Sequence, residues 1–143
     1  MKKLYFILFI LLTGFSACKD DTPNFDTDPN CEDCVEVAKL SKADGQAYLA
    51  IKYNEITSIA NGVVCTNAAN WKIIAIGSKA CGGPTGFIAY EKSINEAAFL
   101  KKVKDYTAAQ VVFNKKWGIF STCEIPIEPS GVECVDGKVK FIK

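Results

Sequence analysis

The amino-acid sequence predicts an α+β domain in which two helices pack on one face of a small, disulfide-stabilised antiparallel sheet. Three observations predict this fold. Two segments show the helical spacing of apolar residues, several short runs are rich in β-branched and aromatic residues, and the connections between them are short. Six cysteines follow residue 30, and an even number favours disulfides in an exported chain. The length of 143 residues allows one such domain, over residues 31–143.

The first residues have the pattern of an export signal. Met1–Lys3 is basic, and Leu4–Phe15 is an apolar run of about a dozen residues, too short to span a bilayer. Ser16-Ala17 stands directly before Cys18, as in the lipobox of bacterial lipoproteins, although a phenylalanine replaces the usual leucine. We expect a lipoprotein signal peptide over residues 1–17 and a lipid on Cys18 that anchors the chain to the membrane. The alternative is a conventional signal peptide that leaves Cys18 as a thiol.

Residues 18–30 are polar, contain two prolines and lack an apolar period, which predicts a lipidated, acidic, flexible tether. The pair Asp20-Asp21 is similar to the signal that sends some lipoproteins of Gram-negative bacteria to the outer face of the outer membrane. We therefore expect an outer-membrane lipoprotein displayed at the cell surface. A lipoprotein that faces the periplasm is the alternative.

The domain opens with Cys31-Glu32-Asp33-Cys34, and residues 35–40 fit either a short strand or the first turns of a helix. A helix is predicted over residues 43–61 and ends at Gly62, although Gly45 weakens its first turn. One face of this helix carries Leu49, Tyr53, Ile56 and Ala60.

Trp71–Ile76 and Phe87–Tyr90 are predicted strands, joined by the glycine-rich turn Ala80–Gly86. The glycines of this turn allow positive φ, and its proline fixes its own φ. We expect Cys81 to tie the turn to another part of the chain. The candidate binding residues of the turn are Gly82, Gly83, Pro84 and Gly86.

A second helix is predicted to start at a capping box, in which Ser93 caps the helix and Glu96 reaches back. It ends before Gly118, where Lys115-Lys116 suits the C-terminal dipole. Its apolar stripe consists of Phe99, Val103, Tyr106, Gln110, Phe113 and Trp117.

The C-terminal part is predicted to contain about three strands. Ile119–Cys123 is the first, stopped by Pro126 and Pro129. Residues 132–135 and 138–142 flank Asp136-Gly137, a strong hairpin signal.

The six cysteines of the domain allow many pairings. The preferred set is Cys31–Cys34, Cys65–Cys81 and Cys123–Cys134, because each closes a local loop. A thioredoxin-like redox role for Cys31–Cys34 is disfavoured, since acidic residues lie between the thiols. A role for Cys31 and Cys34 as half of a zinc site is also disfavoured, since the sequence has no second closely spaced cysteine pair and no histidine.

The composition excludes several functions. All of the chain's basic residues are lysines, and without the arginine fork a nucleic-acid partner is not expected. The absence of histidine removes the usual general base and the Ser-His and Cys-His arrangements. No spacing typical of a glycosidase pair is found among the carboxylates considered, which are Glu91, Glu96, Asp105, Glu124 and Glu128. No catalytic residue, metal ligand or cofactor is predicted.

The block Trp71–Pro84, together with Tyr90, Asn114, Cys123 and the hairpin Cys134–Lys138, resembles a family of small bacterial lipoproteins with a Lys-Ala-Cys-Gly-Gly-Pro signature. In that family a serine follows the tyrosine, whereas this chain has glutamate there. The resemblance implies an exported lipoprotein and a shared fold, and it carries no activity with it.

The sequence thus favours a non-enzymatic binding module that presents the glycine-rich turn to an extracellular or periplasmic protein or glycan. An inhibitor of a hydrolase is one form of such a module. A hydrolase that uses carboxylates alone and a structural envelope protein are the alternatives.

Overall fold

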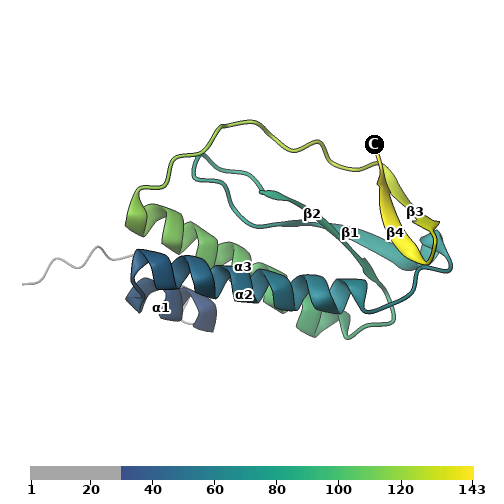
Figure 1. The fold of residues 1–143 in the computed structure, drawn as a ribbon, viewed down its shortest axis with the longest axis horizontal. Helices are drawn as coiled ribbons and strands as arrows, with labels where there is room; N and C mark the ends of the chain where they lie inside the picture. The colour runs from purple at the N-terminus through teal and green to yellow at the C-terminus, as the bar shows by residue number, and fades with distance from the viewer. Residues whose placement is uncertain (1–29) are drawn as a thin grey trace, which may run out of the picture.

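Residues 30–143 fold into three α-helices and two antiparallel β-hairpins, which confirms the predicted α+β class (Figure 1). The computed structural model describes these residues. The predicted signal peptide, the predicted lipid on Cys18 and the predicted tether up to residue 29 lie outside the described residues. The elements in chain order are α1 (Glu32–Lys39), α2 (Lys42–Asn61), the 3₁₀ turn η1 (Ala68–Asn70), β1 (Trp71–Ile76), β2 (Gly86–Glu91), α3 (Glu96–Trp117), β3 (Gly131–Val135) and β4 (Lys138–Ile142).

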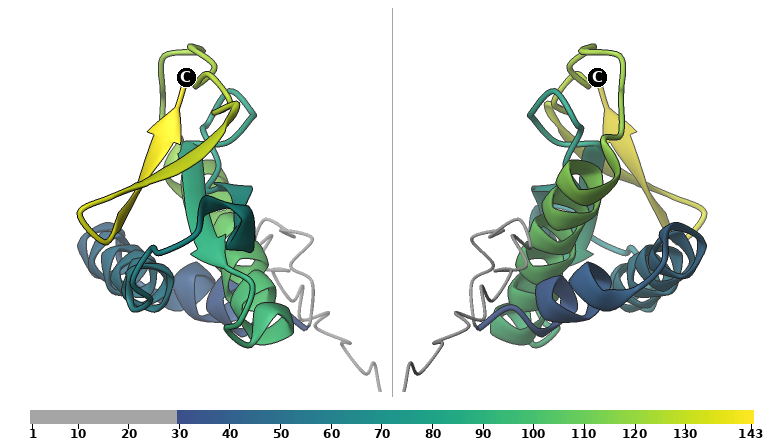
Figure 2. Two further views of the ribbon diagram at one scale, coloured as in Figure 1. Left: turned by 90° about the vertical axis from the view of Figure 1, so that its right-hand side faces the viewer. Right: turned by 90° about the vertical axis from the view of Figure 1, so that its left-hand side faces the viewer.

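The β1–β2 hairpin lies over the helices, with β1 against α3 and β2 against α2 (Figure 2). The strands pair antiparallel in a register that places Trp71 opposite Glu91, which confirms the two predicted strands and the turn between them. Since side chains alternate along a strand, one face of the hairpin joins the helical core through Ile76, Ile88 and Tyr90.

The β3–β4 hairpin covers the opposite face of β1–β2 at one end of the molecule (Figure 1). This contact forms a second, smaller apolar cluster of Cys65, Trp71 and Ala89 with Val132 and Val139 packed on it. The turn of the hairpin is Asp136-Gly137, with φ of 51° and 73°. Both residues are left-handed, so the predicted Asp-Gly hairpin is confirmed.

The sequence fits either a strand or a helix over residues 35–40, and the structure has helix α1 there up to Lys39. At its start the Cys34 N–H donates to the Sγ of Cys31 over 3.2 Å. At its end the Nζ of Lys116, on α3, donates to the carbonyls of Ala38 (2.8 Å) and Leu40 (2.6 Å). A helix of eight residues is unstable alone, so these tertiary contacts explain why it forms.

Helix α2 begins after Ser41, whose side chain accepts a hydrogen bond from the Asp44 N–H. Gly45 is buried, and a Cβ there would lie 3.0 Å from the ring of Phe113. The glycine that weakens the helix in sequence terms therefore leaves room for the ring of Phe113 at the contact between α2 and α3. The helix ends at Asn61 as predicted, with Gly62 in the right-handed region at φ −73°.

Helix α3 begins at Glu96, but the predicted capping box is wrong. The cap is Asn95, whose Oδ1 accepts from the Ala98 N–H at 3.2 Å. The backbone N–H of Ser93 donates to the carboxylate of Glu91, the last residue of β2, and Asn95 takes the capping role predicted for Ser93. At the other end Gly118 adopts φ 55°, the left-handed conformation that ends many helices.

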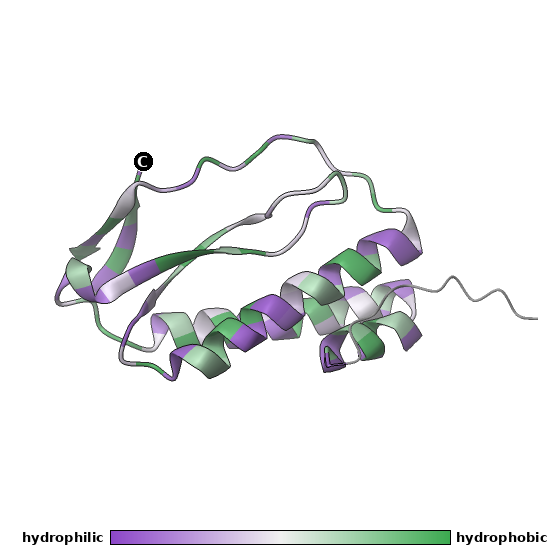
Figure 3. Ribbon diagram, turned by 180° about the vertical axis from the view of Figure 1, so that it is seen from behind, coloured by the Kyte–Doolittle hydropathy of each residue, from purple (hydrophilic) through white to green (hydrophobic). Residues whose placement is uncertain are grey.

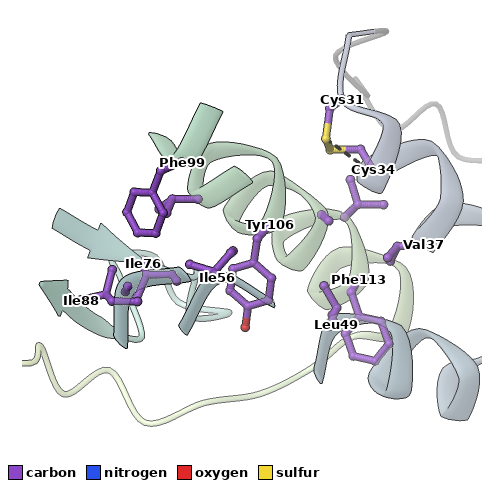
Figure 4. Packing of buried hydrophobic residues seen from close by; sticks show 14 of the residues in the cluster. Cys31, Cys34, Val37, Leu49, Ile56, Ile76, Ile88, Phe99, Tyr106 and Phe113 are labelled. Atoms are coloured by element: carbon purple, nitrogen blue, oxygen red, sulfur yellow. Dashed lines mark hydrogen bonds between the residues drawn. A yellow bond between two sulfur atoms is a disulfide. The ribbon is translucent and has the colours of Figure 1, made fainter. Parts of the chain in front are cut away.

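The main core lies between the three helices and the inner face of β1–β2 (Figure 4). Most of the predicted face of α3 is buried, namely Phe99, Val103, Tyr106 and Phe113, whereas Gln110 and Trp117 are half-buried. Most of the predicted face of α2 is also buried, with Tyr53 as the exposed exception. Within residues 30–143, no helix combines the length and the hydropathy needed to cross a membrane.

Residues 119–130, here called the α3–β3 segment, run from the end of α3 past the β1–β2 turn to β3 (Figure 1). The predicted strand Ile119–Cys123 is wrong, because this segment contains no strand. Its β-branched and aromatic residues suit a strand, but no neighbouring strand pairs with them. Pro126 and Pro129 also lack the N–H that a sheet partner would need.

Candidate functional site at the turn between β1 and β2

The β1–β2 turn, residues 77–85, has the backbone that its glycines predict. Gly82 and Gly83 have φ of 95° and 79°, and both are exposed. The turn is closed by two backbone bonds, from Lys79 N–H to Gly83 O (2.9 Å) and from Gly82 N–H to Lys79 O (3.0 Å). Pro84 is half-buried, and Gly86 is the first residue of β2, without positive φ. Of the three candidate binding glycines, Gly82 and Gly83 thus have positive φ and Gly86 does not.

Gly77 is a further glycine on which the turn depends. Its φ is 75°, and a Cβ there would lie 2.1 Å from the Oγ1 of Thr85. Thr85 closes the base of the turn, since its N–H (3.1 Å) and its hydroxyl (2.9 Å) both donate to the carbonyl of Ile76. No side chain fits at Gly77 while Thr85 holds this position.

Three polar side chains on one face of α3 hold the start of the turn by its main chain. Thr107 Oγ1 accepts from the Gly77 N–H at 3.0 Å, and Gln110 Oε1 accepts from the Ser78 N–H at 2.8 Å. Asn114 Nδ2 then donates to the Ser78 carbonyl at 2.8 Å. Their spacing of three and four residues places them in a row along the helix. Sequence reasoning gave Gln110 only a core position, named Asn114 only through the family resemblance, and missed Thr107.

The α3–β3 segment lies against the other side of the turn. The ammonium group of Lys79 donates to the carbonyl of Glu124. The Sγ of Cys81 lies 3.5 Å from the hydroxyl of Ser121 and 3.7 Å from the carbonyl oxygen of Thr122. The turn is therefore held on two sides, by α3 and by the segment.

Three large apolar side chains of the segment project into solvent. Phe120 is 96% exposed, Ile125 79% and Ile127 82%. Apolar positions recur along the segment at the upper edge of the molecule (Figure 3). Exposed apolar groups gathered on one short segment are typical of interaction surfaces.

Two shallow grooves flank the turn. One, of about 310 Å³, lies between the turn and α3, and its lining includes Ser78, Gly82, Val111, Asn114 and Ile119. The other, of about 360 Å³, lies beneath the segment, and its lining includes Gly86, Phe87, Pro126, Ile127 and Phe141. No Asp or Glu side chain lines either groove.

The cysteines pair differently from the preferred prediction. Cys31–Cys34 is confirmed, but Cys65 pairs with Cys134, across 69 residues. The predicted pairs Cys65–Cys81 and Cys123–Cys134 are wrong, because the β3–β4 hairpin packs on the start of β1 and brings Cys134 to Cys65. The thiols of Cys81 and Cys123 are exposed and are not joined.

These two thiols are neighbours, since Cys81 Sγ lies beside Thr122, the residue before Cys123, and they affect each other's ionisation. The neighbouring Cys123 side chain, followed by the Ser121 hydroxyl, lowers the pKa of Cys81. The same contact raises the pKa of Cys123. Cys81 is thus the partner that more readily becomes a thiolate.

Cys31 and Cys34 lie at the start of α1, the position that a redox motif would need. However, they are only 2% and 1% exposed and form a disulfide against α3, where Cys31 Sγ is 3.7 Å from the Asp105 carbonyl oxygen. A buried disulfide is not accessible to a thiol reactant. The contact supports a structural role for this pair.

The carboxylates considered from sequence have structural partners or lie on the segment. Glu96 accepts from Lys72 (2.6 Å) and from the Tyr90 hydroxyl (2.8 Å). The Lys72 ammonium holds the pKa of Glu96 below its usual value, whereas burial and then Glu96 raise the pKa of Tyr90 to about 12. Asp105 pairs with Lys101, Glu91 accepts from the Ser93 N–H, and Glu124 and Glu128 are exposed.

Among residues 30–143, no three Cys, Asp or Glu side chains gather in a way that could hold a metal ion.

No protein-family model, curated protein or solved structure matches the chain. The geometry of the candidate site offers an exposed apolar segment held beside a rigid turn.

Proposed function

We propose that the protein is an exported, lipid-anchored binding module whose binding surface is the α3–β3 segment together with the β1–β2 turn. The observation that carries this proposal is the exposure of Phe120, Ile125 and Ile127 on one segment. A monomer that leaves these side chains in water forgoes the free energy of burying them, roughly 1.5–3 kcal/mol for each fully buried side chain. A partner that covers them recovers part of that free energy.

The chemistry of the surface favours a protein as the partner. Two of the three exposed side chains are isoleucines, which pack well against other apolar side chains but offer neither a flat ring nor a hydrogen bond to a sugar. Phe120 supplies the kind of aromatic anchor that protein interfaces often contain. A glycan is therefore the weaker choice.

The main chain of the segment supports a specific binding mode. Among the residues that the structure describes, no backbone–backbone hydrogen bond involves residues 120–129. The available N–H and C=O groups can pair with a partner's strand or line an extended groove, such as the substrate cleft of a protease. Inhibition of a hydrolase would be one consequence of binding in this way.

The attachment of the segment supports tight binding. The Ile119 N–H donates to Asn114 O at 3.0 Å, and the Ser130 N–H donates to Ile142 O at 2.9 Å, so both ends are fixed. Lys79 and Cys81 hold its middle. Since these contacts restrict the chain before a partner arrives, less conformational entropy is lost on binding.

Export and anchoring rest on the predicted signal peptide and lipobox. The two disulfides support the export part of the proposal, because disulfides persist mainly in oxidising compartments. Display at the cell surface would present the segment to proteins outside the cell.

The test is site-specific cross-linking of the full chain in its native envelope. A photo-reactive side chain replaces Phe120 or Ile127, with Ile51 and Val64, exposed apolar residues outside the segment, as control positions. We expect one protein to cross-link from the segment positions and not from the controls. The triple variant F120S/I125S/I127S should weaken its binding at least tenfold, whereas I51S/V64S should leave binding unchanged.

Hydrogen exchange of the purified complex checks the binding mode. The backbone amides of residues 120–125, 127 and 128 should gain protection when the partner binds. Equal cross-linking from segment and control positions, or binding that survives the triple substitution, would refute the proposal. Inhibition assays apply if the cross-linked protein is a hydrolase.

A further inference from the structure

We propose that Cys81 and Cys123 are a redox-active pair that closes into a third disulfide between the β1–β2 turn and the α3–β3 segment. The proposal goes beyond the proposed function and does not depend on it. It assigns a covalent link to the two cysteines that the other bridges leave over within residues 30–143.

The β1–β2 turn and the α3–β3 segment lie side by side at these two cysteines. The Sγ of Cys81 lies 3.7 Å from the carbonyl oxygen of Thr122, the residue directly before Cys123, and 3.5 Å from the Ser121 hydroxyl. On the other side of Cys123, the Glu124 carbonyl accepts from Lys79. The two chain segments are thus already aligned on both sides of the cysteines.

The other four cysteines of the domain are already paired. Cys31 is joined to Cys34, and Cys65 to Cys134. Neither Cys81 nor Cys123 has another cysteine available for an intramolecular bridge within the described domain. In an oxidising compartment two adjacent, exposed thiols are readily oxidised to a disulfide.

The chemistry proceeds by thiol–disulfide exchange with an oxidant, which is a disulfide of a thiol oxidoreductase or of a small thiol. The Cys81 thiolate attacks one sulfur of that disulfide, forms a mixed disulfide and releases the first thiol, which takes up the proton that Cys81 lost. The Cys123 thiolate then attacks the Cys81 sulfur and releases the second thiol, which takes up the proton from Cys123. The pair loses two electrons and two protons, and the oxidant gains them.

The contact between the thiols sets the order of these steps. Because the pKa of Cys81 is lowered and that of Cys123 is raised, Cys81 supplies the attacking thiolate and Cys123 resolves the mixed disulfide. Lys79, close to both sulfurs, adds a positive charge that favours the thiolate. A low-pKa, exposed cysteine beside a resolving cysteine is the usual arrangement of a redox-sensitive pair.

The environment of the pair makes it the reducible bridge. Cys81 and Cys123 are exposed, whereas the Cys31–Cys34 bridge is buried in the core and Cys65 is buried in the second cluster. Exposed disulfides are the more easily reduced ones. Reduction of Cys81–Cys123 would remove the covalent link between the segment and the turn while both structural bridges stay closed.

The first experiment maps the bridges in the full chain, extracted in detergent with thiols blocked. Trypsin leaves Cys65 in peptide 53–72, Cys81 in 80–92, and Cys123 together with Cys134 in 117–138. The proposed bridge joins these peptides into one cluster. A second cut with a glutamate-specific protease, after Glu124, separates Cys123 from Cys134.

We expect residues 117–124 to be linked to the peptide that contains Cys81, and the linked mass to disappear on reduction. A bridge from Cys81 to Cys65 would overturn the proposal. It would also be overturned if both Cys81 and Cys123 were still free, and so alkylated, when thiols are blocked after equilibration with excess oxidised glutathione.

The second experiment titrates the same protein with glutathione redox buffers and follows each cysteine by alkylation and mass mapping. We expect the Cys81–Cys123 bridge to be half reduced at a lower ratio of reduced to oxidised glutathione than the Cys65–Cys134 bridge. The two midpoint ratios should differ by at least about tenfold. Equal midpoints would contradict the redox-active assignment.

Single variants test the order of attack. After brief exposure to oxidised glutathione, C123S should accumulate a glutathione adduct on Cys81, and C81S should form an adduct on Cys123 more slowly. Comparable far-UV spectra and intact Cys65–Cys134 in both variants are the folding control. A faster adduct in C81S would overturn the assigned roles.

Discussion

The side-chain amide of Asn114 donates a hydrogen bond of 2.8 Å to the carbonyl of Ser78, so α3 holds the β1–β2 turn through its main chain. Such a contact depends on where the backbone lies and not on which side chains the turn carries. The exposed residues of the turn can therefore vary while its position is kept, and the same helix positions the segment that lies against it.

Replacing Asn114 with alanine should destabilise the domain by about 1–2 kcal/mol, because the half-buried Ser78 carbonyl loses its donor. Denaturant unfolding measures the change. The matched control is K115A, the next residue along the helix, whose exposed side chain should contribute within about 0.5 kcal/mol. An N114A variant as stable as this control would show that the hydrogen bond contributes nothing.

Replacing Gly77 with alanine should destabilise the domain by about 2–4 kcal/mol. The new Cβ would lie 2.1 Å from Thr85 Oγ1, and alanine is unfavourable at φ 75°. Gly86 is the control, because a Cβ there meets no atom within 4 Å and its φ is not positive. Thermal unfolding of G77A and G86A should therefore differ by several degrees, and equal midpoints would refute the packing argument.

The phenol of Tyr90 should make stability depend on alkaline pH. Its pKa is raised to about 12, first by burial and then by Glu96, whereas an unfolded tyrosine titrates near 10. Its contribution is therefore fully present below about pH 10 and is lost as the pH rises through about 12. The loss is on the order of 2 kcal/mol.

Tyrosinate absorbance of the folded protein measures the titration of this group, with Y90F as the comparison. The difference between the two titration curves should appear near pH 12. A difference centred near pH 10 would contradict the prediction. Tyr106 and Tyr48, whose pKa values are also raised by burial, remain in both proteins and cancel in the difference.

The two disulfides should differ in their effect on stability. Cys65–Cys134 closes a separation of 69 residues, whereas Cys31–Cys34 closes only 3. In the chain-entropy description, removal of the long-range bridge should cost about 4 kcal/mol and removal of the short one about 2 kcal/mol. Unfolding of C65A/C134A and C31A/C34A measures both. A larger loss in C31A/C34A would show that packing outweighs chain entropy.

Much of the fold follows from local sequence signals. The stripe on α3, the two strands around the glycine-rich turn and the Asp-Gly hairpin each depend on residues close in the chain, and each is confirmed. The short helix α1 could not be decided, because its ends are held by Cys31 and by the distant Lys116.

The errors have a common physical cause, which is dependence on distant partners. Ile119–Cys123 has the composition of a strand, but strand formation needs a neighbour that the topology does not provide. The pairing of Cys65 with Cys134 depends on where the β3–β4 hairpin packs, and loop length alone cannot give that position. In the candidate site the turn was predicted, whereas the helix side chains that hold its main chain were recognised only from the geometry.

The bridge between Cys65 and Cys134 has a consequence for limited proteolysis. The exposed α3–β3 segment lies between these two cysteines in the chain, so any cut within residues 120–129 falls inside the covalent loop that they close. The C-terminal piece, with both strands of the last hairpin, would remain attached to the rest of the molecule. A nicked protein would migrate as an intact chain on a non-reducing gel and separate into two fragments only when a reductant is added.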